Sequence, residues 1–370
     1  MSDVTHGLDL AVRQRAPIAL DAALECAPGE LTALVGPSGS GKTTLLRVIA
    51  GLDRPQQGHV RCAGHTWLDA REGIDLSPQR RRVGLVFQSY ALFPHLSALD
   101  NVAVALSHLP PGQRGERACA LLEQVHLSGL EGRLPDELSG GQQQRVAVAR
   151  ALARDPAVLL LDEPFSAVDQ VTRGKLQREL ARLRERLKIP VVLVTHDLDE
   201  ARLLADRIVI IHRGTTLQSG TPDQVLLRPC SGDVARLVDL PNVFEGTVSA
   251  LGPDGTLHLR WRGYTLEVRS DGGFRPGERV DWVVPSRFVI LHRRDKPSRG
   301  EHENPVGGVC TECTMLGDNA LVSIDVDADV DASLSFGVPA HVARRNGLAP
   351  GVEVRVSLLA EGIHLMPGKR

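Results

Sequence analysis

The pattern of hydrophobic and polar positions changes near residue 240. Before that point, short runs that are apolar at every position alternate with stretches in which apolar residues recur at helical spacing. Such runs are typical of strands in a parallel sheet that helices cover on both faces. The sequence therefore predicts an α/β domain with strands over residues 30–36, 157–164, 189–197 and 206–214.

Beyond residue 240 the pattern consists of short strands separated by glycine and proline turns, which predicts an all-β region. The segment 276–291 aligns with 350–365 at a constant offset. The coinciding apolar pairs are Val280 with Val354, Trp282 with Val356, Val284 with Leu358, Val289 with Ile363 and Leu291 with Leu365. We therefore expect two related small β-barrels, joined by a polar, turn-rich linker over residues 292–305.

A phosphate-binding loop is predicted by the segment GPSGSGKTT, which follows the first strand and opens a helix. Its glycines let backbone N–H groups surround phosphates. Lys42 is expected to reach the β- and γ-phosphates, and the Thr43 hydroxyl to bind Mg²⁺. The nucleotide-binding residues expected here are Gly36, Pro37, Ser38, Gly39, Ser40, Gly41, Lys42, Thr43 and Thr44.

Three further strands end in polar side chains that suit ATP hydrolysis. Asp162 suits the Mg²⁺ shell, and Glu163 is placed to polarise a water for attack on the γ-phosphate. His196 ends a neighbouring strand and is expected to contact the γ-phosphate. Gln88 is expected to touch Mg²⁺ and the attacking water. The catalytic candidates are thus Glu163, His196 and Gln88, and the metal candidates are Thr43, Gln88 and Asp162.

A second anion-binding feature is predicted by LSGGQQQR over residues 138–145. Ser139, Gly140 and Gly141 expose backbone N–H groups at the positive end of a helix dipole, which favours an anion. No lysine lies beside them, so the sequence leaves open which molecule supplies that anion.

Taken in order, GPSGSGKTT, FQ, LSGGQQQR, LLLDEP, SAVD and TH resemble the motifs of the nucleotide-binding subunit of ATP-binding-cassette transporters, over roughly residues 1–235. The resemblance implies a head-to-tail homodimer with ATP and Mg²⁺ as cofactors. Ser139, Gly140, Gly141 and Gln142 of one subunit would close on the γ-phosphate held by the other, with Asp169 at the same interface.

The resemblance also implies a fold class and domain limits. We expect an α/β P-loop cassette over 1–235, with a helical subdomain over about 89–155, followed by an all-β tandem barrel domain over 241–370. The two repeats of that domain, resembling oligosaccharide-binding (OB) barrels, are expected over about 241–294 and 303–368.

The adenine site departs from the family pattern. Members of the family stack the adenine on an aromatic residue upstream of the phosphate loop, and no aromatic residue stands there in this chain. Ile18 or a neighbour is expected to fill that place, which predicts weak base stacking and poor discrimination between ATP and GTP.

Partners follow from the resemblance to importers. The segment 89–137 corresponds to the region that receives a helix of the integral membrane permease, and an extracytoplasmic substrate-binding protein would join through the complex. Its apolar residues Tyr90, Leu92, Phe93 and Leu96 are expected mostly to pack in the helical subdomain. With no apolar run of about 18 residues and no signal peptide, we expect a peripheral protein at the cytoplasmic face of the cell membrane.

The β region resembles the regulatory domains of importer ATPases, most closely the molybdate-binding barrels of the molybdate/tungstate group. Those barrels hold an oxyanion with backbone amides and small polar groups, and Asn304 stands where such a barrel opens. The resemblance therefore implies uptake of molybdate or tungstate. An importer of sulfate, polyamines, iron or sugars is the alternative, with the β region serving only for dimerisation as a further one.

Other classes of protein fit less well. A net charge of −2 and 3% aromatic residues disfavour nucleic-acid binding. A DNA-repair or translation ATPase of this family would carry coiled-coil inserts or two fused cassettes, a scaffold would lack Glu163 or His196, and a P-loop kinase or GTPase would lack LSGGQ. Cys310 and Cys313, with His302 nearby, are interpreted as ordinary thiols, with a metal or redox role as the alternative.

Overall fold

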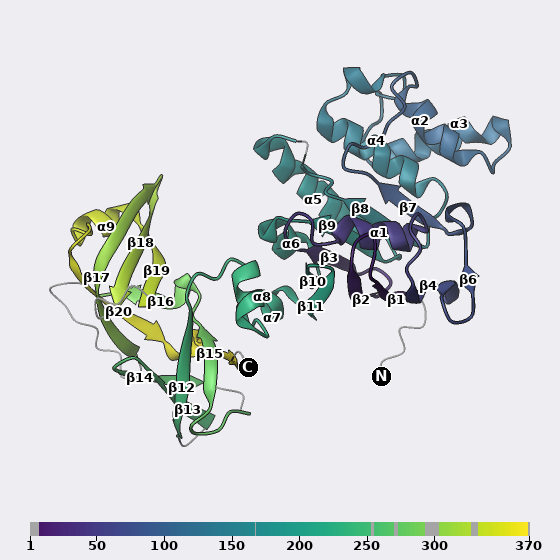
Figure 1. The fold of residues 1–370 in the computed structure, drawn as a ribbon. Coiled ribbons are helices and arrows are strands. Elements are labelled where there is room, and N and C mark those ends of the chain that lie inside the picture. The colour runs from purple at the N-terminus through teal and green to yellow at the C-terminus, as the bar shows by residue number, and fades with distance from the viewer. Residues whose placement is uncertain are drawn as a thin grey trace. The chain divides into compact units, whose positions relative to one another are not determined.

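The computed structural model describes residues 7–166, 168–252, 255–269, 273–292, 303–326 and 332–368 (Figure 1). At Val171 and Glu303 it describes the backbone alone. The chain divides into two compact units, residues 1–222 and 223–370.

A mixed sheet forms the centre of the first unit. Its strands are β1 (Leu8–Gln14), β2 (Leu20–Cys26), β3 (Leu31–Val35), β4 (Gln57–Cys62), β5 (His65–Asp69), β6 (Ile74–Asp75), β7 (Val83–Val86), β8 (Val158–Asp162), β9 (Val191–Thr195), β10 (Arg207–His212) and β11 (Thr215–Gly220). In the described part of the chain their order is β6-β5-β4-β1-β2-β11-β10-β3-β9-β8-β7.

The five strands from β10 to β7 run parallel to one another. Successive residues of these strands enter two different cores. In β8, Leu159 and Leu161 join one apolar cluster, whereas Val158 and Leu160 join another on the opposite face. The prediction of strands that are apolar because both faces are buried is therefore confirmed.

The remaining strands were not predicted. β1 pairs antiparallel with β2 and β4, and β10 pairs antiparallel with β11. In β1 only alternate positions are fully buried, among them Leu8, Leu10 and Val12. The two-residue alternation of the segment LDLAVRQ is the signal that could have identified this edge of the sheet.

The helices of the first unit are α1 (Lys42–Ala50), α2 (Ala98–Ala103), α3 (Pro111–Gln124), α4 (Gly140–Leu152), α5 (Gln170–Arg186) and α6 (Leu198–Leu204), with short 3₁₀ turns η1 (Pro78–Arg80), η2 (Val104–Leu106) and η3 (Pro135–Glu137). Figure 1 shows α2, α3 and α4 gathered into one lobe. Val102, Leu122 and Val146 pack together in its core. This lobe lies in the segment where a helical subdomain is expected.

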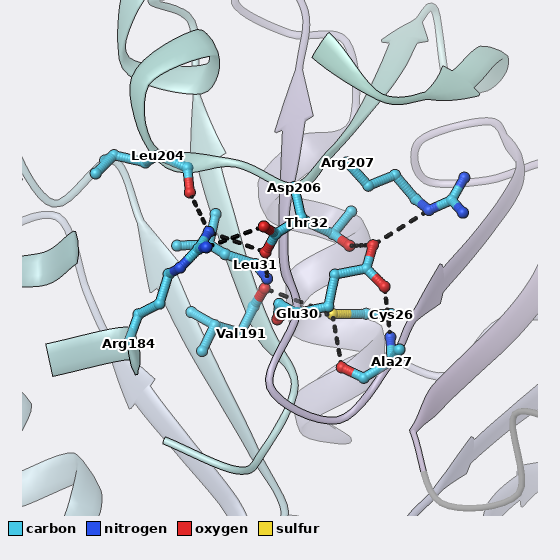
Figure 2. A network of polar contacts seen from close by, with 10 residues as sticks. All are labelled: Cys26, Ala27, Glu30, Leu31, Thr32, Arg184, Val191, Leu204, Asp206 and Arg207. Carbon is cyan, nitrogen blue, oxygen red and sulfur yellow. Dashed lines mark hydrogen bonds and ion pairs between the residues drawn. The ribbon is translucent and has the colours of Figure 1, made fainter. Parts of the chain in front are cut away.

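A polar network fixes the amino ends of β3, β9 and β10 (Figure 2). Asp206 accepts the backbone N–H of Leu31 at 2.9 Å and an Arg184 N–H at 2.9 Å. Arg207 donates to Glu30 at 3.2 Å. Burial raises the pKa of the Cys26 thiol, which lies in the same network, to about 11. The thiol therefore stays protonated near neutral pH.

The second unit contains two five-stranded sheets. Its strands are β12 (Val243–Leu251), β13 (Thr256–Trp261), β14 (Tyr264–Arg269), β15 (Arg279–Val283), β16 (Val289–Leu291), β17 (Glu303–Leu316), β18 (Asn319–Val326), β19 (Ser333–Pro339), β20 (Glu353–Leu359) and β21 (His364–Pro367). Its helical elements are α7 (Pro222–Leu227), α8 (Gly232–Leu237), η5 (Ser286–Phe288), α9 (Ala340–Arg345) and η7 (Ala360–Gly362).

The two sequence repeats form an all-β domain consistent with OB-like barrels, and they exchange one strand each. One sheet has the order β14-β13-β12-β15-β21 and the other β16-β20-β17-β18-β19, so each repeat supplies its last strand to the sheet of the other. Trp282 pairs with Leu365 and Leu291 with Val356, which are equivalent pairs under the repeat. A single apolar cluster contains residues of both sheets. The strands β12 to β16 and β17 to β21 fall within the limits expected for the two repeats, and the exchange of the last strands was not predicted.

Two asparagines have matching structural roles in the two repeats. Asn304 donates to Leu358 O and Glu267 O, both at 2.9 Å, and accepts the N–H of Glu267 at 2.6 Å. Asn242 repeats this arrangement with the backbone of Val284 and Ser335. The Asn304 amide is thus bonded to backbone groups, whereas the sequence placed it at the opening of an oxyanion-binding barrel.

The helices α7 and α8 belong with the second unit, although the sequence placed residues up to 235 in the first domain. Ala235 of α8 packs against Val283 of β15 and Met366 of β21. His364 contributes a ring nitrogen 2.9 Å from Pro229 O. The boundary between the two compact units therefore lies between residues 222 and 223, whereas the sequence placed the domain boundary between residues 235 and 241.

Candidate functional site

Four neighbouring parallel strands bring the predicted residues to one edge of the sheet. The phosphate loop follows β3, His196 follows β9, Asp162 and Glu163 end β8, and Gln88 follows β7. Because the strands are parallel and adjacent, their carboxyl ends lie side by side, which is where open α/β sheets bind ligands.

The phosphate loop wraps the start of α1. A Cβ atom at Gly36 would lie 2.1 Å from Ile211 O, and Gly41 has a φ of 98°, so both positions require glycine. The Lys42 ammonium donates to the carbonyl oxygens of Gly36 at 2.7 Å and Pro37 at 2.9 Å. Burial lowers the pKa of Lys42. Phosphate oxygens would replace these carbonyls as acceptors.

Oxygen donors for a divalent cation lie beside this loop. Thr43 Oγ1 donates to Asp162 Oδ1 at 3.3 Å. Burial raises the pKa of Asp162, an effect that the Thr43 hydroxyl partly opposes. A hydroxyl and a carboxylate are ligands that Mg²⁺ accepts, and a cation would stabilise the buried charge. These two residues therefore fit the metal that the sequence implied.

The raised pKa of Asp162 carries a prediction about pH. A carboxyl group whose folded-state pKa is raised favours folding below its unfolded pKa, and that contribution is lost as the pH rises through the folded pKa. We expect Asp162→Asn to raise the melting temperature of the nucleotide-free protein at about pH 7, with the difference shrinking towards about pH 4. Calorimetry across this range measures it. A variant that melts below the wild type at pH 7 would contradict the cause assigned to the shift.

Glu163 and His196 meet at the same edge. Glu163 Oε2 lies 3.3 Å from His196 Nδ1. The Glu163 backbone has a φ of 43°, and its N–H donates to Val194 O at 3.0 Å. The Ser166 hydroxyl donates to Glu163 O at 2.9 Å. This turn holds the Glu163 carboxylate next to the His196 imidazole. The carboxylate is then available as a base and the imidazole as a contact for the γ-phosphate.

Gln88 is exposed and makes no direct hydrogen bond with the described residues of the phosphate loop. The segment that follows it is firmly held. The Tyr90 hydroxyl donates to Pro164 O at 3.1 Å, directly after Glu163. Arg150 of α4 donates to the carbonyls of Tyr90 and Ala91, each at 2.8 Å. The chain after Gln88 is therefore tied to both β8 and α4, which sequence reasoning missed.

Most of the apolar residues in this segment pack inward, as expected. Tyr90 is buried, and Leu92 packs partly against the core of the lobe. Leu96 is half-buried. Phe93 remains 42% exposed, with the Arg150 guanidinium 5.7 Å from its ring centre.

The segment LSGGQ forms the start of α4. Ser139 caps the helix: its hydroxyl accepts the Gln142 N–H at 3.3 Å, and its own N–H donates to Gln142 Oε1 at 2.8 Å. A Cβ at Gly141 would lie 3.1 Å from Leu176 of α5. In the described chain, Ser139, Gly140, Gly141 and Gln142 make no hydrogen bond with the phosphate loop. The start of α4 is thus already folded, and the described residues of the phosphate loop in the same chain make no hydrogen bond with it.

Asp169 and Ile18 are the two other residues that the sequence assigned to nucleotide binding. Asp169 Oδ1 accepts the Thr172 N–H at 3.0 Å at the start of α5. Ile18 is 45% exposed in the loop between β1 and β2. Leu20, two residues on, lies 3.0 Å from where a Gly41 Cβ would stand. Ile18 therefore belongs to the loop that leads into Leu20, and its contact with adenine stays a prediction.

The thiols and the helices give two further findings. Cys310 is buried and Cys313 half-buried, and within the ranges given above no cluster of three or more His, Cys, Asp or Glu residues could hold a metal. His302 lies outside the described residues. None of the helices in the described part of the chain combines the length and apolarity that crossing a bilayer requires.

The known proteins that this chain resembles belong to one family. The family model "ABC transporter" matches residues 20–166. The spermidine/putrescine import ATP-binding protein PotA of Methylococcus capsulatus is 40% identical over 90% of this chain and 84% of its own length. Its counterpart in Rubrobacter xylanophilus is 42% identical over 95% of this chain and 90% of its own.

A relative with a different named substrate is similarly close. The sulfate/thiosulfate import ATP-binding protein CysA of Escherichia coli is 44% identical over 78% of this chain and 88% of its own length. The matches agree with the order of motifs and with the strand-end geometry. The chain belongs to the ATP-binding-cassette transporter family and is an ATP-hydrolysing subunit of an importer.

Proposed function

We propose that this chain works as a head-to-tail, ATP-dependent homodimer that powers a membrane permease from the cytoplasmic face of the cell membrane. The observation that carries the proposal is the pair of half-sites on one chain. The phosphate loop, Asp162, Glu163 and His196 form one half, and the capped start of α4 at Ser139 forms the other. Two copies would complete each other's sites.

The residues divide the work of hydrolysis. Backbone N–H groups of the loop and Lys42 hold the phosphates. Thr43 and Asp162 would hold Mg²⁺, which would supply positive charge next to the phosphates. Glu163 takes a proton from the attacking water, and His196 holds the γ-phosphate and orients that carboxylate. The start of α4 in the second copy supplies N–H donors to the γ-phosphate. The Gln88 amide would contact Mg²⁺ and the attacking water.

The contact with the permease is assigned to the segment after Gln88. Its exposed Phe93 lies among residues that are bonded to Pro164 and to α4 through Tyr90 and Arg150. A partner helix at this surface would therefore act on the chain next to Glu163. An extracytoplasmic substrate-binding protein would deliver the solute to that permease.

For the transported solute we propose polyamines. The cassette itself recognises ATP, so evidence on the solute must come from matches that include the second unit. The first unit ends at residue 222 of 370. A relative named for polyamines aligns over 95% of the chain, one named for iron over 94% and one named for sulfate over 92%, so the polyamine relative has the fullest coverage of the three. The matched relatives are named for polyamines, sulfate or iron, and these names favour the alternative left open by the sequence over molybdate or tungstate. Sulfate is the second candidate, favoured by the Escherichia coli relative.

Uptake assays test the solute directly. In cells that make this protein, the chromosomal gene is replaced by the Glu163→Gln variant, and uptake of labelled spermidine, putrescine, sulfate and molybdate is measured. We expect polyamine uptake to fall to background and the other rates to stay unchanged. Selective loss of sulfate or molybdate uptake would reassign the solute, and unchanged uptake of all four would contradict the proposal.

A prediction about the nucleobase follows from Ile18. Because an aliphatic side chain stacks poorly, kcat/KM for GTP should lie within about tenfold of that for ATP. Ile18→Tyr should lower KM for ATP by about tenfold, since base–aromatic stacking is worth about 1–3 kcal/mol. Phosphate-release kinetics with both nucleotides measure this, with Ile18→Leu as the matched control. An unchanged KM in the tyrosine variant would show that Ile18 does not contact the base.

A further inference from the structure

A small pocket lies behind the start of α4. It is enclosed by the end of α3, by α4 and by α5, and its volume is about 210 Å³. Its apolar lining consists of Val125, Val148, Leu176, Leu180 and Leu183. Apolar walls with a few polar groups are typical of small-molecule sites.

Two acceptor oxygens in the pocket make no hydrogen bond with the described residues, and one of them is also without an ion pair. Gln144 is 4% exposed, and among the described residues its Oε1 meets no hydrogen-bond donor. Glu179 Oε2 also lacks a hydrogen bond, although Arg145 Nε lies 3.5 Å away at ion-pair distance. Arg145 is already bonded to the carbonyls of Gly141 and His126. Buried acceptors are nearly always paired, so these two atoms favour a ligand that donates N–H groups.

The exposed residues at the mouth of the pocket favour an anionic group on the ligand. Arg182 and Arg186 line it from successive turns of α5, and both are exposed. Neither makes an ion pair within the described part of the chain. Guanidinium groups pair best with carboxylates. The mouth therefore favours an anionic group, whereas the interior favours an N–H donor and an apolar body.

We propose that this pocket binds a large apolar α-amino acid such as phenylalanine. Its ammonium group donates to Gln144 and Glu179, its side chain occupies the apolar wall, and its carboxylate faces Arg182 and Arg186. The pocket adjoins the start of α4, because Leu176 lines the pocket and is also the residue that a Cβ at Gly141 would touch. A ligand in the pocket would therefore contact the same leucine that packs beside Gly141 at the start of α4.

Calorimetric titration of the full nucleotide-free chain tests this. The probes are L-phenylalanine, phenethylamine, which lacks the carboxylate, and 3-phenylpropanoate, which lacks the amine. We expect saturable phenylalanine binding, and at least about tenfold weaker binding of each analogue. No saturable binding up to about 10 mM would overturn the proposal. Equal binding of 3-phenylpropanoate would overturn the role of Gln144 and Glu179.

Variants locate the binding. Leu180→Trp fills the pocket, and Gln144→Leu removes the amide with little change in shape; each should weaken phenylalanine binding at least about tenfold. Arg178→Gln is the matched control, because this arginine is exposed on α5 outside the pocket. Melting curves show that the variants fold. Wild-type binding in both Leu180→Trp and Gln144→Leu would overturn the assignment. The result does not depend on the proposed transport function, since binding alone is measured.

Discussion

Glu163→Gln is expected to slow ATP turnover by about 10²–10⁴-fold while ATP binding is retained. Glutamine has the shape of glutamate, so the turn fixed by the Glu163 N–H bond to Val194 O should persist. It cannot accept a proton from water, and its contact with His196, now 3.3 Å, loses its charge. Lys42 and Thr43 are untouched, so nucleotide still binds. A dimer with ATP in its sites should therefore accumulate.

Two measurements check this expectation. Phosphate release gives the rate, and sedimentation with MgATP gives the fraction of dimer. Glu185→Gln, an exposed position on α5, is the matched control and should change neither quantity. Hydrolysis by the Glu163 variant at the wild-type rate would show that another group removes the proton. Loss of ATP binding would instead show that Glu163 holds the nucleotide.

The strand ends of the site could be predicted because their signals are local. A strand buried on both faces is apolar up to its last residue, as in β8 and β9, and the residue after it must lie at the ligand edge. The sequence therefore located Glu163 and His196 without any knowledge of long-range contacts. Tyr90 shows the limit: its hydroxyl bond to Pro164 joins residues far apart in sequence. No local pattern distinguishes it from an exposed aromatic residue.

The exchanged strands of the second unit could not be predicted for a different reason. The repeats were found because their apolar positions coincide, and that same likeness makes the partners interchangeable. Leu291 pairs with Val356 and Trp282 with Leu365, yet either strand would fit either sheet by its pattern. The connection through η5 leads β16 to the sheet of the second repeat, and the connection through η7 leads β21 to the sheet of the first. These connections decide which sheet each strand joins. Periodicity within a strand carries no such information.

Ser139→Arg is expected to abolish ATP-driven dimerisation and to slow turnover at least about 100-fold, if N–H donors from a second copy are needed at the γ-phosphate. The long cationic side chain would stand where the second copy's phosphate loop must approach. It also removes a cap whose hydroxyl accepts the Gln142 N–H at 3.3 Å, and places positive charge at the positive end of the α4 dipole. ATP binding by the monomer should persist, because Lys42 and Thr43 are on the other half-site.

The structure offers a matched control for the cap. Ser231 caps α8 in the second unit, and its hydroxyl accepts the Val234 N–H at the same 3.3 Å. Each arginine variant should lose about 1 kcal/mol of stability from the missing cap. Sedimentation with MgATP in a Glu163→Gln background should show dimer for Ser231→Arg and monomer for Ser139→Arg. Equal dimerisation of the two would mean that the start of α4 does not meet a second copy. Equal failure would mean that the loss of dimer comes from destabilisation.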